Sequence, residues 1–219
     1  KRLRGVRQTL SESMGLLLPP INARDDLSLK PSHYAVLLRG TVIAQAEVFP
    51  DRLMAIASAQ VYGDLDGIPG TEPAYGMPVW WIAQDDRANA LGLGYQVVDA
   101  ATVIATHVSK LVREHLPELM RHEDVSALLE RLSVQAPKLA AALDKALTHS
   151  QMLKVFRLLL AENVSLKDIV PIATTLVESA ETTKDPILLA AEVRCTLRRQ
   201  IVASLVGQAT QLKAFNLSG

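Results

Sequence analysis

The chain has 219 residues, with 23 Lys or Arg and 23 Asp or Glu, so its formal net charge is zero. This balance argues against a nucleic-acid-binding module, which usually carries a basic excess. Hydrophobic residues make up 49% of the chain and aromatic residues only 4%, which favours helices around an aliphatic core. The single cysteine, Cys195, excludes an internal disulfide and any zinc site built on several thiolates. The chain starts inside a helical pattern and without Met, so we expect a fragment of a longer protein.

The first hundred residues mix short strand patterns with Pro and Gly. A helix is predicted from residue 2 to Gly15. Strands are predicted over 34–38 and 41–49, and Arg39-Gly40 between them indicates a hairpin. Apolar residues alternate in the second strand, so one face of the hairpin is expected to be buried: Val42, Ala44, Ala46 and Val48.

Three further strand or helix patterns surround a loop. A strand is predicted over 53–57, and the segment 63–78 follows it with four Gly and three Pro. Such a density of Gly and Pro predicts an irregular loop. A strand over 79–82, a short helix over 85–93 and a strand over 95–98 complete this half of the chain.

From residue 99 onward the pattern is almost wholly helical. Asp99 is the predicted N-cap of a long helix that runs to about Met120. Its apolar stripe includes Val103, His107 and Leu111, and its polar edge is Thr102, Thr106, Ser109, Lys110 and Arg113.

Shorter helices are predicted after it. Caps at Ser165 or Asp168 and at Asp185-Pro186 indicate where the last two begin. Gly207 is the predicted end of the final helix. The remaining predicted elements are helices over 124–132, 137–147 and 149–162 and a strand over 212–217.

Motifs of catalysis are missing from the sequence. It has no P-loop, no G-x-S-x-G turn and no dinucleotide fingerprint. His115, Glu118 and His122 lie close together, but Pro117 interrupts the helical register, so a solvated helix end is favoured over a metal site. We therefore predict no enzyme activity and no bound cofactor.

Two single residues admit a chemical and a structural interpretation. His107 lies on an apolar stripe, where a packed, hydrogen-bonded histidine is favoured over a general base. Cys195 lies between Arg194 and Arg198, which favour a thiolate, but no histidine is near it in sequence, so a nucleophile is disfavoured.

Aromatic residues gather around the Gly/Pro loop. Tyr75, Trp80 and Trp81 are a third of the chain's nine aromatic residues. An aromatic ring on a constrained loop is typical of a binding anchor, and Tyr75 is the candidate. The alternative is that these rings fill the core of a small α/β domain, which is favoured for at least one of the two tryptophans.

Several stretches resemble one family. Residues 94–107, which read GYQVVDAATVIATH, resemble the signature of the FlhA family, the export-gate proteins of the bacterial flagellar type III secretion system. Four other stretches are similar to the same family in the same order, and the resemblance covers nearly the whole chain: residues 18–29, residues 46–52, residues 67–69 with 72–76, and residues 165–169 leading into 185–186.

The resemblance implies an α+β fold with several subdomains. A discontinuous α/β subdomain would take residues 1–50 and 100–119, with a small α/β subdomain inserted at 51–99. An all-helical subdomain would follow at 120–199, and residues 200–219 would be the truncated start of a fourth. Composition alone predicts only the change near residue 100.

The resemblance also implies a function. Members have a membrane half and a cytosolic half, and the cytosolic half forms a homo-nonameric ring beneath the export channel. There it docks export chaperones with bound late substrates, such as filament, cap and hook-junction proteins, and works with other export apparatus proteins to order delivery. This chain resembles the cytosolic half, so we expect the cytoplasmic domain of an inner-membrane protein. Because most of the fourth subdomain is missing, we expect this fragment to be a monomer.

The chaperone-binding groove of the family is marked by an acid, a Phe three residues later and a Thr on the long helix. These match Glu72, Tyr75 and Thr106, with Glu in place of the usual Asp and Tyr in place of the usual Phe. Tyr75 is expected to bury its ring in the partner, and Glu72 to offer a charge at the rim. Thr106 and Thr102 are expected to line the opposite wall.

Two alternatives stay open. The nearer one is the homologous export gate of virulence injectisomes, which shares the architecture. The flagellar branch is favoured because residues 46–52 and 94–107 resemble it more. The more distant alternative is an enzyme of another class that uses the Gly/Pro loop.

Overall fold

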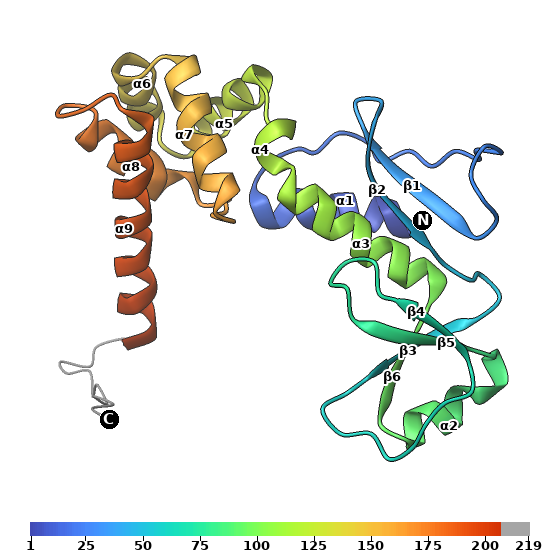
Figure 1. Ribbon diagram of the computed structural model, residues 1–219. Coiled ribbons are helices and arrows are strands. Elements are labelled where there is room, and N and C mark those ends of the chain that lie inside the picture. The colour runs from blue at the N-terminus through green and yellow to red at the C-terminus, as the bar shows by residue number, and fades with distance from the viewer. Residues whose placement is uncertain (207–219) are drawn as a thin grey trace. The chain divides into compact units, whose positions relative to one another are not determined.

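The computed structural model describes the backbone of residues 1–206 and the side chains of residues 1–203 (Figure 1). It divides into two compact units, residues 1–10 with 18–114, and residues 11–17 with those from 115 onward. The first unit combines helices with two small sheets, and the described part of the second is helical. This mixture confirms the predicted α+β class. The finer division into subdomains stays a prediction.

A β-hairpin follows the first helix, α1 (Arg2–Met14), and a long extended segment. Its strands β1 (His33–Leu38) and β2 (Thr41–Glu47) pair antiparallel through the predicted turn. The register shifts by one residue between Val36 and Leu37, so Val36 faces Ala44 whereas Leu37 faces Val42. This bulge breaks the alternation, and Val42 is 48% exposed. The prediction that Val42 belongs to the buried face was wrong for this reason.

Four antiparallel strands form the second sheet, in the order β4-β5-β3-β6. The predicted strands are present as β3 (Leu53–Ala57), β5 (Pro78–Ile82) and β6 (Tyr95–Asp99). The structure adds β4 (Ile68–Thr71), so the prediction of a purely irregular loop over 63–78 was wrong. An edge strand tolerates Pro69, because its outer side needs no backbone donor.

Both faces of this sheet are covered. On one face a cluster of Leu53, Ala55, Ile82, Ala90 and Tyr95 packs under α2 (Arg87–Gly92), which follows a short 3₁₀ turn, η1 (Gln84–Asp86). On the other face Met54 and Trp81 pack against Val103 of α3 (Ala100–Glu114). Trp81 is 2% exposed, which confirms the prediction of a core role for one tryptophan.

Helix α3 begins as predicted and ends earlier. The N–H of Thr102 donates to Oδ1 of Asp99 over 2.8 Å, which is an N-cap hydrogen bond. The helix ends at Glu114, and a separate short helix α4 (Leu116–Leu119) follows it. Pro117 lacks the N–H that would continue the ladder, so the predicted continuation to Met120 was wrong.

The second unit is a set of helices around aliphatic side chains and Phe156. Asp185 caps the last helix, since its Oδ1 accepts the N–H of Ile187 over 2.9 Å. Asp168 precedes its helix as predicted but makes no capping bond through its side chain. The predicted stop at Gly207 and strand at 212–217 lie outside the described residues. Besides α4, its helices are α5 (His122–Gln135), α6 (Pro137–Ala146), α7 (His149–Ala161), α8 (Ile169–Ser179) and α9 (Pro186–Val206).

A tight turn after α1 belongs to this unit. Gly15 has φ +69°, and a Cβ placed on it would lie 2.4 Å from the backbone N and Cα of Lys167. The guanidinium of Arg131 donates to the carbonyl of Gly15 over 3.0 Å and to that of Leu166 over 2.6 Å. The glycine is therefore required both for its backbone angle and for the close approach.

None of the described helices is long and apolar enough to cross a membrane.

Candidate functional site

The connection between β4 and β5 is a short ordered turn, residues 72–77, which we call the Tyr75 loop. The N–H of Glu72 donates to the carbonyl of Met77 over 2.8 Å, and that of Gly76 donates to the carbonyl of Glu72 over 2.9 Å. The carboxylate of Glu72 accepts the N–H of Ala74 over 3.0 Å and that of Tyr75 over 2.6 Å. Backbone groups that have no strand partner are thereby satisfied within the loop.

Glu72 is therefore an internal residue of the loop. Only 3% of its surface is exposed, and its two oxygens are both occupied by backbone donors. The expectation that Glu72 offers a charge at the rim was wrong, because the local hydrogen bonds draw its side chain inward. Its carboxylate bonds to N–H groups two and three residues later, much as the shorter Asp and Asn side chains do when they fix a turn.

Tyr75 has the opposite environment. Its surface is 65% exposed, so the alternative that it fills the core is excluded. The ammonium of Lys110, from α3, lies 5.2 Å from the centre of its ring, a cation–π distance. The same ammonium donates to the carbonyl of Ala74 over 2.5 Å and lies 3.2 Å from a carboxylate oxygen of Glu114. The ring is thus exposed and yet held.

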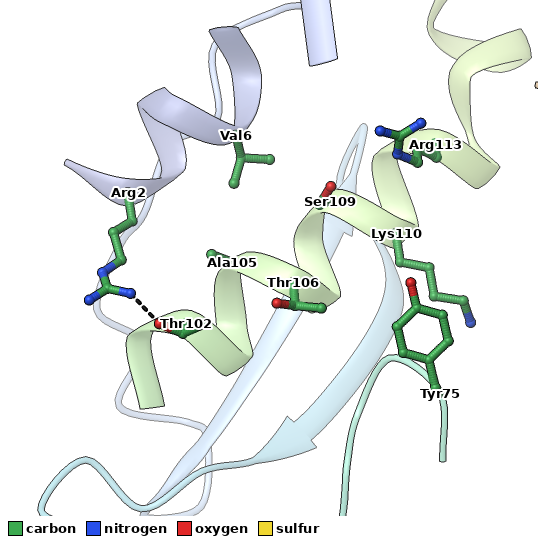
Figure 2. A pocket seen from close by; sticks show the side chains of 9 residues that line it. All are labelled: Arg2, Val6, Tyr75, Thr102, Ala105, Thr106, Ser109, Lys110 and Arg113. Atoms are coloured by element: carbon green, nitrogen blue, oxygen red, sulfur yellow. Dashed lines mark hydrogen bonds between the residues drawn. The ribbon is translucent and has the colours of Figure 1, made fainter. Parts of the chain in front are cut away.

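An open hollow of about 400 Å³, which we call the α3 hollow, lies beside this ring. Figure 2 shows Tyr75 and Lys110 at one end of it and Arg2 and Val6 of α1 at the other, with small side chains of α3 between them. Small residues in the middle let a partner's chain approach the helix closely. The lining residues are Arg2, Val6, Tyr75, Thr102, Ala105, Thr106, Ser109, Lys110 and Arg113.

The far end of the hollow is held by an ion pair. Arg2 hydrogen-bonds the hydroxyl of Thr102, and its guanidinium lies 2.7 Å from Oδ2 of Asp99. Hydrogen bonds from Thr102, together with the charge of Arg2, lower the pKa of Asp99. Asp99 therefore stays ionised, and it caps α3 and orients Arg2 at the same time.

The structure brings together two of the three predicted site residues. Tyr75 and Thr106 line the α3 hollow, whereas Glu72 lies within the loop that carries Tyr75. Sequence reasoning did not assign Lys110 to the site, although it lies one helical turn after Thr106 on the predicted polar edge. Arg2 and Val6 could not be found from local sequence, because about 100 residues separate them from α3.

A buried polar pair lies on the inner side of α3. His107 is 5% exposed, and its Nδ1 shares a hydrogen bond of 2.6 Å with the hydroxyl of Tyr34. Burial lowers the pKa of His107 and raises that of Tyr34, so both groups stay neutral. The prediction of a packed, hydrogen-bonded histidine is confirmed.

Groups suited to metal binding do not gather in the described part of the chain. Within it no three or more His, Cys, Asp or Glu side chains are grouped so that they could hold a metal ion. Cys195 is exposed on α9. The arrangement at the α3 hollow favours binding of a protein segment, since it offers an aromatic ring, small apolar residues and hydroxyl groups.

Comparison with known sequences identifies relatives over the whole chain. The profile described as the FHIPEP family matches residues 1–219. The truncated flagellar export/assembly protein LfhA of Escherichia coli (strain K12) is 52% identical over 206 residues, which are 94% of this chain and 36% of that protein. The flagellar biosynthesis protein FlhA of Helicobacter pylori is 34% identical over 219 residues, which are 100% of this chain and 30% of that protein. The chain thus spans about a third of the length of these curated relatives.

Solved structures share the fold. The CdsV protein of Chlamydia pneumoniae matches with a TM-score of 0.80 at 24% identity, over 94% of this chain and 60% of that one. Nonameric EPEC SctV-C matches with a TM-score of 0.69 at 22% identity, over 92% of this chain and 61% of that one. At these identities the likeness concerns the arrangement of helices and strands.

Proposed function

We propose that this chain, which belongs to the FHIPEP family, is a docking platform of a flagellar type III export gate. In this proposal Tyr75, Glu72 and Thr106 make the binding site for export chaperones with bound substrates, and the chain orders delivery of these substrates to the secretion channel. Glu72 acts within the loop, and Tyr75 and Thr106 contact the partner. The chain has no catalytic role in this proposal.

The exposure of Tyr75 on an ordered loop carries the proposal. A large ring that is 65% exposed, and yet carried by a backbone whose preceding peptide group is hydrogen-bonded at both its N–H and its C=O, gives up little conformational freedom when a partner covers it. Rings in this situation are frequent anchors of protein interfaces. The α3 hollow beside it supplies room for a partner's side chains.

The names of the relatives support the flagellar branch. Curated relatives between 31% and 52% identical are flagellar proteins, whereas the similar solved structures, such as CdsV and the EscV cytosolic domain from the type III secretion system, are 24% identical or less. EPEC SctV-C, which shares the fold, is nonameric, and this supports a ring in the whole protein. We place the chain on the cytoplasmic side of the inner membrane, where export substrates are delivered.

Calorimetric titration with a flagellar export chaperone loaded with its substrate tests the docking role. Tyr75→Ala should weaken binding by about 2 kcal/mol, or about 30-fold in Kd, the effect of an anchor residue. Tyr75→Phe should bind like the wild type, because it keeps the ring. Thermal melts should be nearly unchanged, since the ring is exposed.

Tyr62→Ala is the matched control. Tyr62 is 69% exposed and is not part of the α3 hollow, so its removal should leave affinity unchanged. Equal affinity of Tyr75→Ala and wild type would contradict the assignment of the site. Weakening of similar size in Tyr62→Ala would point to unspecific hydrophobic association.

A further inference from the structure

Lys110 joins α3 to the Tyr75 loop at three points. Its ammonium donates to the carbonyl of Ala74 over 2.5 Å, lies 5.2 Å from the ring centre of Tyr75 and lies 3.2 Å from a carboxylate oxygen of Glu114. Figure 2 shows its side chain running along the ring of Tyr75. One cation therefore fixes both the backbone just before Tyr75 and the ring itself.

The two sides of the loop are held by different groups. Glu72 bonds to the N–H groups of Ala74 and Tyr75 from within the loop, and Lys110 bonds to the carbonyl of Ala74 from α3. Glu114 lies one turn further along α3 and orients the ammonium. The internal bonds give the loop its shape, and Lys110 links that shape to the helix that carries Thr106.

We propose that Lys110 is a positioning residue of the docking site, which holds Tyr75 in its binding-ready orientation against α3. This inference rests on the proposed function of the α3 hollow. An exposed tyrosine without this contact would sample several rotamers and would lose that freedom on binding. With Lys110 in place, the folded chain has already restricted the ring before the partner arrives.

Direct attraction between Lys110 and the partner is the main alternative. The ammonium of Lys110 is already engaged by a carbonyl, a carboxylate and a ring, which leaves it poorly suited to a new ion pair. Arg113 lines the same hollow, is exposed and carries the same charge. Arg113 is therefore a matched control for attraction by charge alone.

The first test measures the affinity for a substrate-loaded flagellar export chaperone by calorimetry. Lys110→Met keeps most of the length of the side chain and removes the charge, and it should weaken binding about five- to tenfold. Lys110→Arg should restore most of the affinity, because a guanidinium also donates to a carbonyl and stacks on a ring. Arg113→Met should change affinity less than about twofold. Equal weakening by Lys110→Met and Arg113→Met would overturn the proposal.

A double-mutant cycle separates positioning from direct contact. If Lys110 acts through the ring, Lys110→Met should have less than about a twofold further effect when it is added to Tyr75→Ala. If it contacts the partner directly, the two effects would add, and the positioning role would be wrong.

Hydrogen exchange of the Tyr75 loop tests the positioning without any partner. Lys110→Met should speed exchange of the Ala74 and Tyr75 amides about tenfold, while Tm stays within about 2 °C of the wild type. Unchanged exchange would overturn the positioning role. Faster exchange together with a wild-type chain that binds no loaded chaperone would leave the positioning role intact and refute the proposed function.

Discussion

Two turns of this chain are fixed by a charged side chain that bonds to backbone, and they leave opposite kinds of surface. In the Tyr75 loop, Glu72 and Lys110 bond to backbone N–H and carbonyl groups and leave a ring that is 65% exposed. In the turn at Gly15, Arg131 bonds to two carbonyls, and the backbone of Lys167 lies so close that no side chain fits.

The difference separates the proposed docking site from a structural junction. Both turns satisfy backbone groups that have no helix or strand partner, as irregular backbone must. At Gly15 the bonds bring two segments of the second unit together, and the space is filled. At Tyr75 the bonds hold an apolar ring exposed to water, a placement that stabilises the fold little, and the proposed docking role gives that ring a partner to cover it.

The largest effect is expected at the filled turn. Gly15→Ala should lower the free energy of unfolding by about 3 kcal/mol or more, because the new Cβ would meet the backbone of Lys167 at a positive φ. Urea unfolding followed by circular dichroism measures the change.

Gly5→Ala is the control for this substitution. Gly5 lies inside α1, and a Cβ there would meet nothing within 4 Å. Alanine should therefore stabilise the chain by about 0.5–1 kcal/mol through its helix propensity. A loss at Gly15 no larger than a few tenths of a kcal/mol, beside the gain at Gly5, would show that the second unit repacks freely there.

Glu72→Gln hardly changes the shape of the side chain, but it should lower the stability of the chain through the Tyr75 loop. Glu72→Gln replaces one oxygen, and its NH₂ group would face the N–H of Ala74 or of Tyr75, so one hydrogen bond would be lost. We expect a loss of about 2 kcal/mol in the free energy of unfolding, the effect of an unsatisfied buried donor. Glu72→Asp keeps both oxygens and should restore most of the stability.

Salt dependence distinguishes a buried Glu72 carboxylate that bonds to the loop backbone from an exposed charge at the rim of the site. Because the Glu72 carboxylate is 3% exposed, the effect of Glu72→Gln should be nearly the same at low and at high salt. If Glu72→Gln weakened only the binding of the loaded chaperone, and salt abolished that effect, Glu72 would instead act as a charge at the rim of the site.

Sequence patterns predicted those features of the fold that depend on neighbouring residues, such as helix caps. Asp99 and Asp185 were found as caps because a cap is a relation between neighbouring residues. Strand β4 was missed because the density of Gly and Pro around it predicted an irregular loop. Only its pairing with β5 makes the segment a strand. The early end of α3 was missed although Pro117 signals it.

The candidate site could be predicted only in part. The Gly/Pro loop singled out Tyr75, the family resemblance named Tyr75 and Thr106, and the exposure of Tyr75 agrees with its loop sequence. The burial of Glu72 follows from the turn geometry, which the sequence does not contain. Arg2 and Val6 reach the α3 hollow only through the tertiary fold, so no spacing rule could identify them.

The smallest expected effect concerns the buried pair of His107 and Tyr34, whose pKa values are both influenced by the charge of Glu72 in the Tyr75 loop. Burial lowers the pKa of His107 below its ordinary value of 6.5, and the charge of Lys110 acts in the same direction, while Glu72 and Glu114 oppose it. The folded chain therefore binds its proton less readily than the unfolded chain, and the free energy of unfolding should fall as pH drops below 6.5 toward the folded-state pKa of His107.

Chemical unfolding between about pH 7.5 and pH 5 measures this slope. His107→Gln keeps a hydrogen-bonding group opposite Tyr34 but cannot take up the proton, so its free energy of unfolding should depend less on pH. The other histidines are the same in both proteins, and Asp26 and Asp99, whose pKa values lie below 3.8, stay ionised in this range. The difference between the two slopes thus isolates His107. Equal slopes would mean that burial on the inner side of α3 does not lower the pKa of His107 in the folded chain, so that its hydrogen-bonded pair with Tyr34 adds nothing to the pH dependence of stability.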